Sequence, residues 1–128
     1  MYILHIPSWF PEMNKPYTGN FIEKHIDSIA SFFPSITLRI EKTEVKNKPM
    51  KDELLSPNNR LITYYVHYKK GIFNKYKSKF LTHFYYQKGA NYIEKNYGIP
   101  ALIHLHVALP MGGFACSFKK KWNIPLLL

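Results

Sequence analysis

The architecture of this chain follows from residues 3–33, ILHIPSWFPEMNKPYTGNFIEKHIDSIASFF. A short apolar strand, predicted over Tyr2–Ile6, leads into a loop stiffened by prolines, and the loop leads into an amphipathic helix. The helix is predicted to begin at Asn20, which has capping-box spacing to Glu23, and to end before Pro34. Loops between a strand and the following helix hold the ligands of open α/β sheets. The segment therefore predicts an α/β domain with a ligand site in this first loop.

The rest of the sequence alternates apolar, strand-like runs with helical patterns. Residues 41–60 are polar and hold two prolines, which predicts a long surface excursion. The expected architecture is a three-layer Rossmann-like parallel sheet of about five strands with helices on both faces, in one domain over residues 1–128. Beyond the first strand and helix, strands are expected at Ile36–Ile40, Leu61–Tyr68, Ala101–Val107 and Ile124–Leu128, and helices at Phe73–Asn96 and in a short segment ending at Trp122.

Composition excludes several classes of protein. A length of 128 residues with 46% hydrophobic and 16% aromatic residues excludes a disordered chain and suffices for one buried core. A single cysteine, Cys116, rules out an internal disulfide and favours a reducing compartment. Prolines interrupt the N-terminal region too early for a signal peptide, and no run is long enough to span a bilayer. A soluble or peripheral protein is expected, and the apolar ending at Leu128 suggests a truncated chain.

The net charge of +10 is unevenly distributed along the chain. No acidic residue lies between Glu53 and Glu94, a segment that holds one arginine and six lysines. A basic surface of this kind attracts polyanions such as nucleic acid, anionic lipid or phosphorylated substrates. A solvated face that only keeps the protein soluble is the alternative, and both interpretations stay open.

Two histidines, His104 and His106, are spaced i, i+2 on an expected strand, so their side chains share one face. Two imidazoles can ligate a metal, but no third ligand has a sensible spacing, and no metal site is expected. His106 lies nearer the carboxyl end of the strand, where ligands bind, whereas His104 fits a buried histidine bonded to backbone. His5 and His25 are expected to be structural.

Other patterns typical of catalysis or phosphate binding are weak. Gly112 and Gly113 precede the last helix, but neither the dinucleotide fingerprint nor the P-loop motif is present. The sequence lacks a G-x-S-x-G elbow, and Cys116 falls in an apolar helix and is expected in the core. Glu12 has no second carboxylate to complete an acid–base pair.

The order of motifs resembles the N-terminal half of a family-4 glycosyltransferase with the GT-B fold. The resemblance rests on SWFPEMNKPYTGNFIEKHIDSIA after the first strand and on PALIHLHVALPMGGFACSFKKKWNIPLLL near the end. Its more specific part is the His-x-His strand followed by Ala-x-Pro, a helix, a Lys-rich turn and Ile-Pro-Leu. It covers almost the whole chain, although residues 41–98 contribute only the order of strands and helices.

The resemblance implies an acceptor-binding domain whose partner domain binds a nucleotide-sugar donor, with retaining sugar transfer in the cleft between the two. The first loop of such domains reaches toward the donor phosphates, and Tyr17, Thr18, Gly19 and Asn20 match it, although many relatives have two glycines there. His106 is implied to face the same cleft. The catalytic residues are expected outside this sequence, so no catalytic residue and no cofactor are assigned here. The nucleotide sugar is a co-substrate, and the fragment alone is expected to be inactive.

Acceptors in the resembled family are cell-envelope glycans or lipid-linked intermediates, which implies a cytoplasmic enzyme, peripheral at the inner face of the membrane. A basic, aromatic segment is the candidate surface for anionic lipid. The alternative is a helix with a core-packed apolar face and solvated lysines. The candidate lysines are Lys69, Lys70, Lys75, Lys77 and Lys79, and the residues expected near the apolar face are Phe73, Tyr76, Phe80, Leu81, Phe84 and Ile93.

The rival function is a basic α/β module that binds nucleic acid or a nucleotide without catalysis. No nucleic-acid-binding motif is present, and the aromatic residues follow buried periodicities. Nucleic acid is therefore not expected as the partner.

Overall fold

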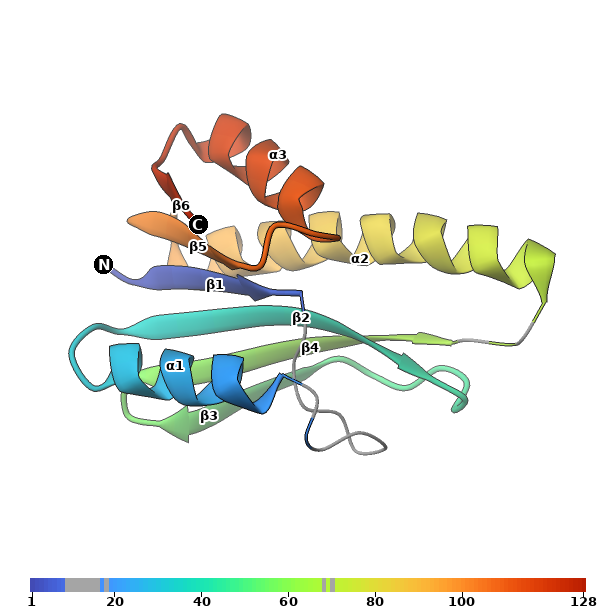
Figure 1. Cartoon of the computed structure of the whole chain (residues 1–128), viewed down its shortest axis with the longest axis horizontal. Helices are drawn as coiled ribbons and strands as arrows, with labels where there is room; N and C mark the ends of the chain where they lie inside the picture. The colour runs from blue at the N-terminus through green and yellow to red at the C-terminus, as the bar shows by residue number, and fades with distance from the viewer. Residues whose placement is uncertain (9–16, 18, 68, 70) are drawn as a thin grey trace.

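The structure is a computed structural model that describes residues 1–8, 17, 19–67, 69 and 71–128, and its elements form a six-stranded mixed sheet with three helices (Figure 1). The strands are β1 (Ile3–Pro7), β2 (Ser35–Thr43), β3 (Lys51–Ser56), β4 (Asn59–His67), β5 (Leu102–His106) and β6 (Leu126–Leu127). The helices are α1 (Asn20–Ala30), α2 (Ile72–Tyr97) and α3 (Gly112–Trp122). This is an α/β arrangement, consistent with a Rossmann-like fold.

Strands lie on both sides of β1, and the order in which the chain adds them changes direction there. The strand order is β3-β4-β2-β1-β5-β6, and every pair is parallel except β3 with β4. From β1 the chain builds outward through β2 to β4, and α2 then carries it back across the sheet to β5, on the other side of β1. The crevice at such a switch point, outside the carboxyl ends of the strands, is where open α/β sheets bind ligands.

One face of the sheet carries the hydrophobic core, under α2 and α3. Leu4 and Ile6 of β1 are fully buried there, with Ile103 of β5 beside them. Phe118 and Trp122 of α3 and Tyr86 of α2 close over these strands. Each fully buried aliphatic side chain contributes about 1.5–3 kcal/mol to folding, so this face supplies most of the hydrophobic stabilisation. Figure 1 shows α1 apart from the α2 and α3 pair.

The opposite face of the sheet is largely polar although it is buried, with Leu61 and Tyr65 of β4 among its apolar residues. Strand residues alternate between faces, and the positions between the core residues hold His5, Ser35, Thr37, Asn59 and Thr63, all buried. Helix α1 covers this face with a narrow apolar stripe, and the amide nitrogen Nδ2 of Asn59 donates a 2.7 Å hydrogen bond to an Asp27 oxygen on the helix. Polar groups buried in this way need hydrogen-bond partners, so the face is built for specific contacts. The buried residues of the stripe are Ile22, Ile26 and Ala30.

The alternation of strands and helices predicted from the sequence is confirmed, but four expectations are wrong. Cys116, expected in the core, is exposed on α3, because it lies beside the buried Ala115 and not on the face of the helix that meets the sheet. Residues 41–60 are not only a surface excursion, because Lys51–Ser56 pairs antiparallel with β4 at the sheet edge, which makes the sheet mixed. No side-chain hydrogen bond caps α1. Its N-cap is Gly19, whose left-handed φ of 72° is accessible to glycine at little cost.

The fourth expectation, the apolar face of α2, is wrong in part. Of its predicted residues, Ile93 is buried, whereas Tyr76, Phe80 and Phe84 are exposed. The helix also buries Ser78 and Tyr86, which the pattern did not indicate, and the side chain of Phe73 lies outside the described residues. The long helix therefore meets the core through its second half more than through its first. Among the residues that the structure describes, no helix combines the length and the apolar character that crossing a bilayer requires.

Candidate functional site

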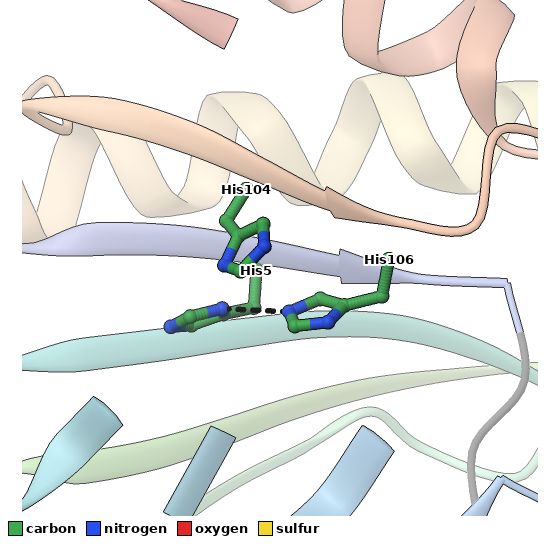
Figure 2. Close-up of side chains that lie close together, drawn as sticks. All are labelled: His5, His104 and His106. Carbon is green, nitrogen blue, oxygen red and sulfur yellow. Dashed lines mark hydrogen bonds between the residues drawn. The ribbon is translucent and has the colours of Figure 1, made fainter. Parts of the chain in front are cut away.

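Three histidine side chains from two neighbouring strands meet on the polar face of the sheet (Figure 2). The parallel register of β1 and β5 places His5 directly beside His104, and His106 follows two residues later on the same face. One ring nitrogen from each histidine lies within 4.8 Å of the other two. His5 and His106 are buried, and His104 is partly exposed. We call His5, His104 and His106 the histidine triad.

Hydrogen bonds assign the proton positions of two of these rings. The hydroxyl of Ser35 donates to the carbonyl of Phe33 at 3.0 Å, so its oxygen accepts from Nε2–H of His5 at 3.2 Å. Nδ1 of His5 then has no hydrogen and accepts from Nε2–H of His106 at 3.0 Å. Because the neutral His106 ring carries its proton on Nε2, its Nδ1 has a lone pair. His104, expected to be buried and bonded to backbone, is instead partly exposed, and neither of its ring nitrogens has a hydrogen-bond partner among the described residues.

Burial keeps the triad neutral. Loss of solvent, with smaller electrostatic contributions from the neighbouring histidines, lowers the pKa of His5 to about 3. The pKa of His106 is lowered to about 3 by burial and by the other nearby rings. Burial also lowers the pKa of His104. Neutral imidazoles carry a lone pair that can accept a proton, a hydrogen bond or a metal ion.

A fourth histidine, His25 of α1, borders the triad. Its exposed ring meets those of His104 and His106 edge-on, with centroids 5.7 and 5.5 Å apart. Sequence reasoning treated His5 and His25 as structural and found no third ligand for the His104–His106 pair. The structure corrects this for His5, because the register between β1 and β5 supplies the third imidazole. Neither that register nor the position of α1 can be deduced from residue spacing.

A cavity of about 510 Å³ opens on the other face of the sheet, at the carboxyl ends of the strands. Ser8 after β1, Lys42 near the end of β2, and Lys79 of α2 contribute polar atoms to its lining. Tyr86 of α2 and Phe114 of α3 form an apolar wall, with their rings stacked 4.4 Å apart. The cavity thus lies beside the switch point of the sheet and combines cationic, hydroxyl and aromatic groups.

Ser78 gives this cavity an unpaired polar group. The side chain is 3% exposed, and its hydroxyl has no hydrogen-bond partner among the described residues. An unsatisfied buried hydroxyl costs about 1–3 kcal/mol, so a ligand or water that reached it from the cavity would be favoured. Sequence reasoning missed Ser78, because a lone serine within a lysine-rich helix gives no signal of its own.

The residues predicted to contact a donor lie at the start of α1 and at the end of β5. Tyr17 is 87% exposed, Gly19 caps α1, and Asn20 is the first residue of that helix. Among the described residues, no hydrogen bond or ring contact joins these three to His106. Thr18 lies outside the described residues. Ser8 is the residue that reaches the end of β5, since its amide donates to the His106 carbonyl at 3.2 Å and its hydroxyl to the Val107 carbonyl at 2.7 Å.

The predicted basic surface lies on the first half of α2 and just before it. Its lysines are exposed, and aromatic side chains lie exposed among them, with Tyr76 at 68%, Phe80 at 71% and Phe84 at 51%. These three follow one another at four-residue intervals, so they form a stripe along the helix. Lys70 lies outside the described residues. The described lysines of this surface are Lys69, Lys75, Lys77 and Lys79.

Comparisons with models of protein families, with curated proteins and with solved structures give no match for this chain.

Proposed function

We propose that this chain is the N-terminal, acceptor-binding part of a glycosyltransferase that moves a sugar from a nucleotide sugar to a cell-envelope glycan or glycolipid. In this proposal the three-layer α/β domain is one half of a GT-B architecture. The donor is bound mainly by a second domain, so residues 1–128 alone bind acceptor but do not transfer sugar. The motif order from the first strand to the Ile-Pro-Leu segment supports this family assignment.

The main observation in support of the proposal is the cavity beside the end of β1, the strand at which the order of the sheet changes direction. Ser8, at the end of β1, lines this cavity and also bonds to the end of β5. A ligand in the cavity would therefore lie at the carboxyl edge of the two central strands, the usual position of ligands in open α/β sheets. A partner domain facing this edge would complete a cleft.

The lining of the cavity favours an anionic, partly apolar acceptor. Lys42 and Lys79 supply positive charge for a phosphate or carboxylate. The hydroxyl of Ser78 can donate a hydrogen bond, whereas that of Thr82 donates to the Ser78 carbonyl and can only accept one from a ligand. The Phe114 ring offers an apolar surface for a lipid chain or for the C–H face of a sugar. A lipid phosphate satisfies both requirements at once.

The exposed face of α2 supports a peripheral position at an anionic membrane. Lysines there attract anionic headgroups, and Tyr76, Phe80 and Phe84 can enter the interface. Since Lys79 belongs to both this surface and the cavity lining, a lipid acceptor would pass from the membrane to the cavity over a short distance.

The proposal is tested by titrating isotope-labelled protein with geranyl phosphate and with geraniol, and following amide resonances by NMR. We expect the phosphate to shift the amides of Ser78 and Thr82, and the alcohol to bind more weakly. Lys79→Met should weaken phosphate binding about tenfold, which corresponds to the loss of one charge-assisted contact. Lys77→Met, a lysine on the same helix that does not line this cavity, is the matched control.

Two outcomes would contradict the proposal. One is the absence of phosphate-dependent shifts around the cavity. The other is saturable, salt-sensitive binding of single-stranded DNA or RNA that Lys77→Met weakens as much as Lys79→Met does, because this would indicate a nucleic-acid-binding surface.

A further inference from the structure

We propose that the histidine triad binds a divalent transition-metal ion of the zinc class, with His5, His104 and His106 as the three protein ligands. This goes beyond the proposed function, because the triad lies on the face of the sheet opposite the acceptor cavity. Three imidazoles within 4.8 Å of one another, from two paired strands, form the donor set that zinc accepts with water in its fourth position.

The backbone fixes the relative position of these ligands before any ion binds. Five consecutive residue pairs hold β1 and β5 in parallel register, from Ile3 with Leu102 to Pro7 with His106. The ligands therefore need only side-chain adjustment. Tetrahedral zinc with Zn–N bonds of 2.0–2.1 Å separates its ligand nitrogens by about 3.3 Å. The present 3.0 Å between Nδ1 of His5 and Nε2 of His106 must open by a few tenths of an ångström.

The hydrogen bond behind His5 supports a ligand role for its Nδ1. Metal-bound histidines usually donate their other N–H to an oxygen, which fixes the tautomer and the ring orientation. Nε2–H of His5 donates in this way to Ser35 Oγ, and the Ser35 hydroxyl in turn donates to the Phe33 carbonyl. Nδ1 of His5 is consequently unprotonated and directed at the other two rings (Figure 2).

The remaining two ligands have nitrogen atoms available. His104 uses neither ring nitrogen for a hydrogen bond within the described part of the chain. His106 now donates from Nε2–H to His5, so ion binding requires its proton to move to Nδ1, which leaves Nε2 free to coordinate. No net proton is lost in this change of tautomer, because the ring stays neutral. Partial exposure of His104 gives solvent access for the ion and for a water ligand.

An all-imidazole site favours particular metals. Neutral imidazoles suit zinc, copper, nickel and ferrous iron, whereas calcium and magnesium require oxygen ligands. Since no carboxylate belongs to the triad, we expect zinc and cobalt(II) to bind and magnesium and calcium to be excluded.

The test is calorimetric titration of chelator-treated protein with zinc chloride, with magnesium chloride as the comparison. We expect one zinc ion per chain and no saturable magnesium binding. Saturating zinc at a hundredfold excess over Kd should raise the melting temperature by about 10 °C. Cobalt(II) should give the intense visible absorption of a four-coordinate site.

Zinc affinities of single-substitution variants identify which histidines bind the ion. His104→Gln should lower zinc affinity by more than about 100-fold, beyond the 10–100-fold effect typical of residues that only orient a ligand. Ser35→Ala, which removes the acceptor behind His5, should lower it by about 10–100-fold. His67→Ala, at the end of β4 and outside the triad, should leave it unchanged.

His104→Gln is the decisive variant because His104 makes no hydrogen bond within the described chain and is partly exposed, so the fold should tolerate the change. Circular dichroism and the melting temperature of this variant, both measured with a metal chelator present, test whether it is folded. The proposal is overturned if His104→Gln does not weaken zinc binding, or if His67→Ala weakens zinc binding by the same factor. Failure to bind zinc at all overturns it without affecting the proposed acceptor site.

Discussion

Asp52 joins three elements of the fold, β3, β4 and α2. One of its carboxylate oxygens accepts a 2.6 Å hydrogen bond from Arg60, and the other accepts hydrogen bonds from the hydroxyls of Tyr92 and Tyr97. These partners lie on β4 and at the end of α2, so Asp52 ties the edge strand β3 to both. Burial on its own would raise the pKa of Asp52, but the hydrogen bonds from its partners outweigh this and hold the pKa below its usual range.

Asp52→Asn should therefore lower the free energy of unfolding at pH 7 by about 2 kcal/mol, the contribution of hydrogen bonds to a charged group. The pKa of Asp52 is lower in the folded state than in the unfolded state. Its stabilising effect is thus complete above the unfolded value of 3.8 and disappears as the pH falls through the lower folded value. Urea denaturation at pH 7 and at several values below pH 4 measures both effects.

Glu53→Gln is the matched control for this prediction. Glu53 is the next residue on β3, its side chain is 43% exposed, and its contact with Lys51 is 3.9 Å long. Exposed pairs of this kind contribute about 0–1 kcal/mol, so the control should be nearly neutral. Equal effects of the two substitutions, or a difference between wild type and Asp52→Asn that persists undiminished at pH 2, would contradict this role of Asp52.

At the scale of elements, Gly89 allows α2 to pack tightly against the sheet. A Cβ atom at this position would lie 2.8 Å from Cδ1 of Leu38 and 3.3 Å from Cε2 of Tyr64. Leu38 is fully buried in β2, so it has little room to move away. The glycine therefore sets the distance between the helix and the two strands beneath it.

Gly89→Leu should lower the free energy of unfolding by about 1–3 kcal/mol, the usual cost of inserting extra atoms into a packed core. Gly113→Ala is the control, because nothing lies within 4 Å of the Cβ that it would add to α3. This change should leave stability unchanged or raise it by up to about 1 kcal/mol, since alanine favours helix over glycine. Thermal and urea unfolding measure the free energy of unfolding of both variants. A Gly89→Leu variant as stable as the wild type would show that α2 packs loosely on the sheet.

Helices and strands could be predicted from the sequence where the residue types within the segment itself favour one secondary structure. The runs at 36–40 and 61–67 lie within β2 and β4, because they are rich in the β-branched and aromatic residues that favour strands, and the predicted end at Tyr68 lies outside the described residues. The strand at Lys51–Ser56 was missed, since it is charged and its pairing depends on β4. In α2 the predicted apolar stripe was wrong at Tyr76, Phe80 and Phe84, because the face that meets the sheet holds Tyr86, Ala90 and Ile93 together with the small residue Gly89.

The candidate sites were less predictable for a similar reason. The pair His104 and His106 follows from strand periodicity, but His5 joins them through the register of two strands that are far apart in the sequence. The cavity at Ser78 depends on where α2 crosses the sheet. Spacing within one element can be deduced from the sequence, whereas alignment between elements requires the fold.

At the scale of the whole molecule, the net charge of +10 and the exposed aromatic stripe on α2 predict binding to anionic membranes. The protein should bind vesicles containing about one third phosphatidylserine and not vesicles of phosphatidylcholine alone, and binding should weaken as salt is added, because salt screens the lysines. Changing Tyr76 and Phe80 together to serine should lower the affinity about tenfold or more, since each aromatic ring contributes about 1.5–3 kcal/mol when buried. Vesicle co-sedimentation measures the affinity.

Phe32 and Phe33 provide the matched control for the aromatic stripe. They are 79% and 58% exposed at the end of α1, outside the basic surface. Changing both to serine should leave vesicle affinity unaltered. Equal losses in the two double variants would indicate non-specific adsorption of any exposed aromatic residue, and binding to uncharged vesicles would remove the role of the lysines.

The two edges of the sheet differ in their tendency to recruit another strand. The first half of the β3 edge carries Lys51 and Glu53, and charges at an edge discourage pairing with foreign strands, whereas Leu54 and Leu55 in its second half are 60% and 49% exposed. The β6 edge is formed by Leu126 and Leu127, and Leu127 is 53% exposed. Strand addition, whether productive or leading to aggregation, therefore meets no charged side chain on β6, and a charged residue introduced at Leu127 would protect the sheet there.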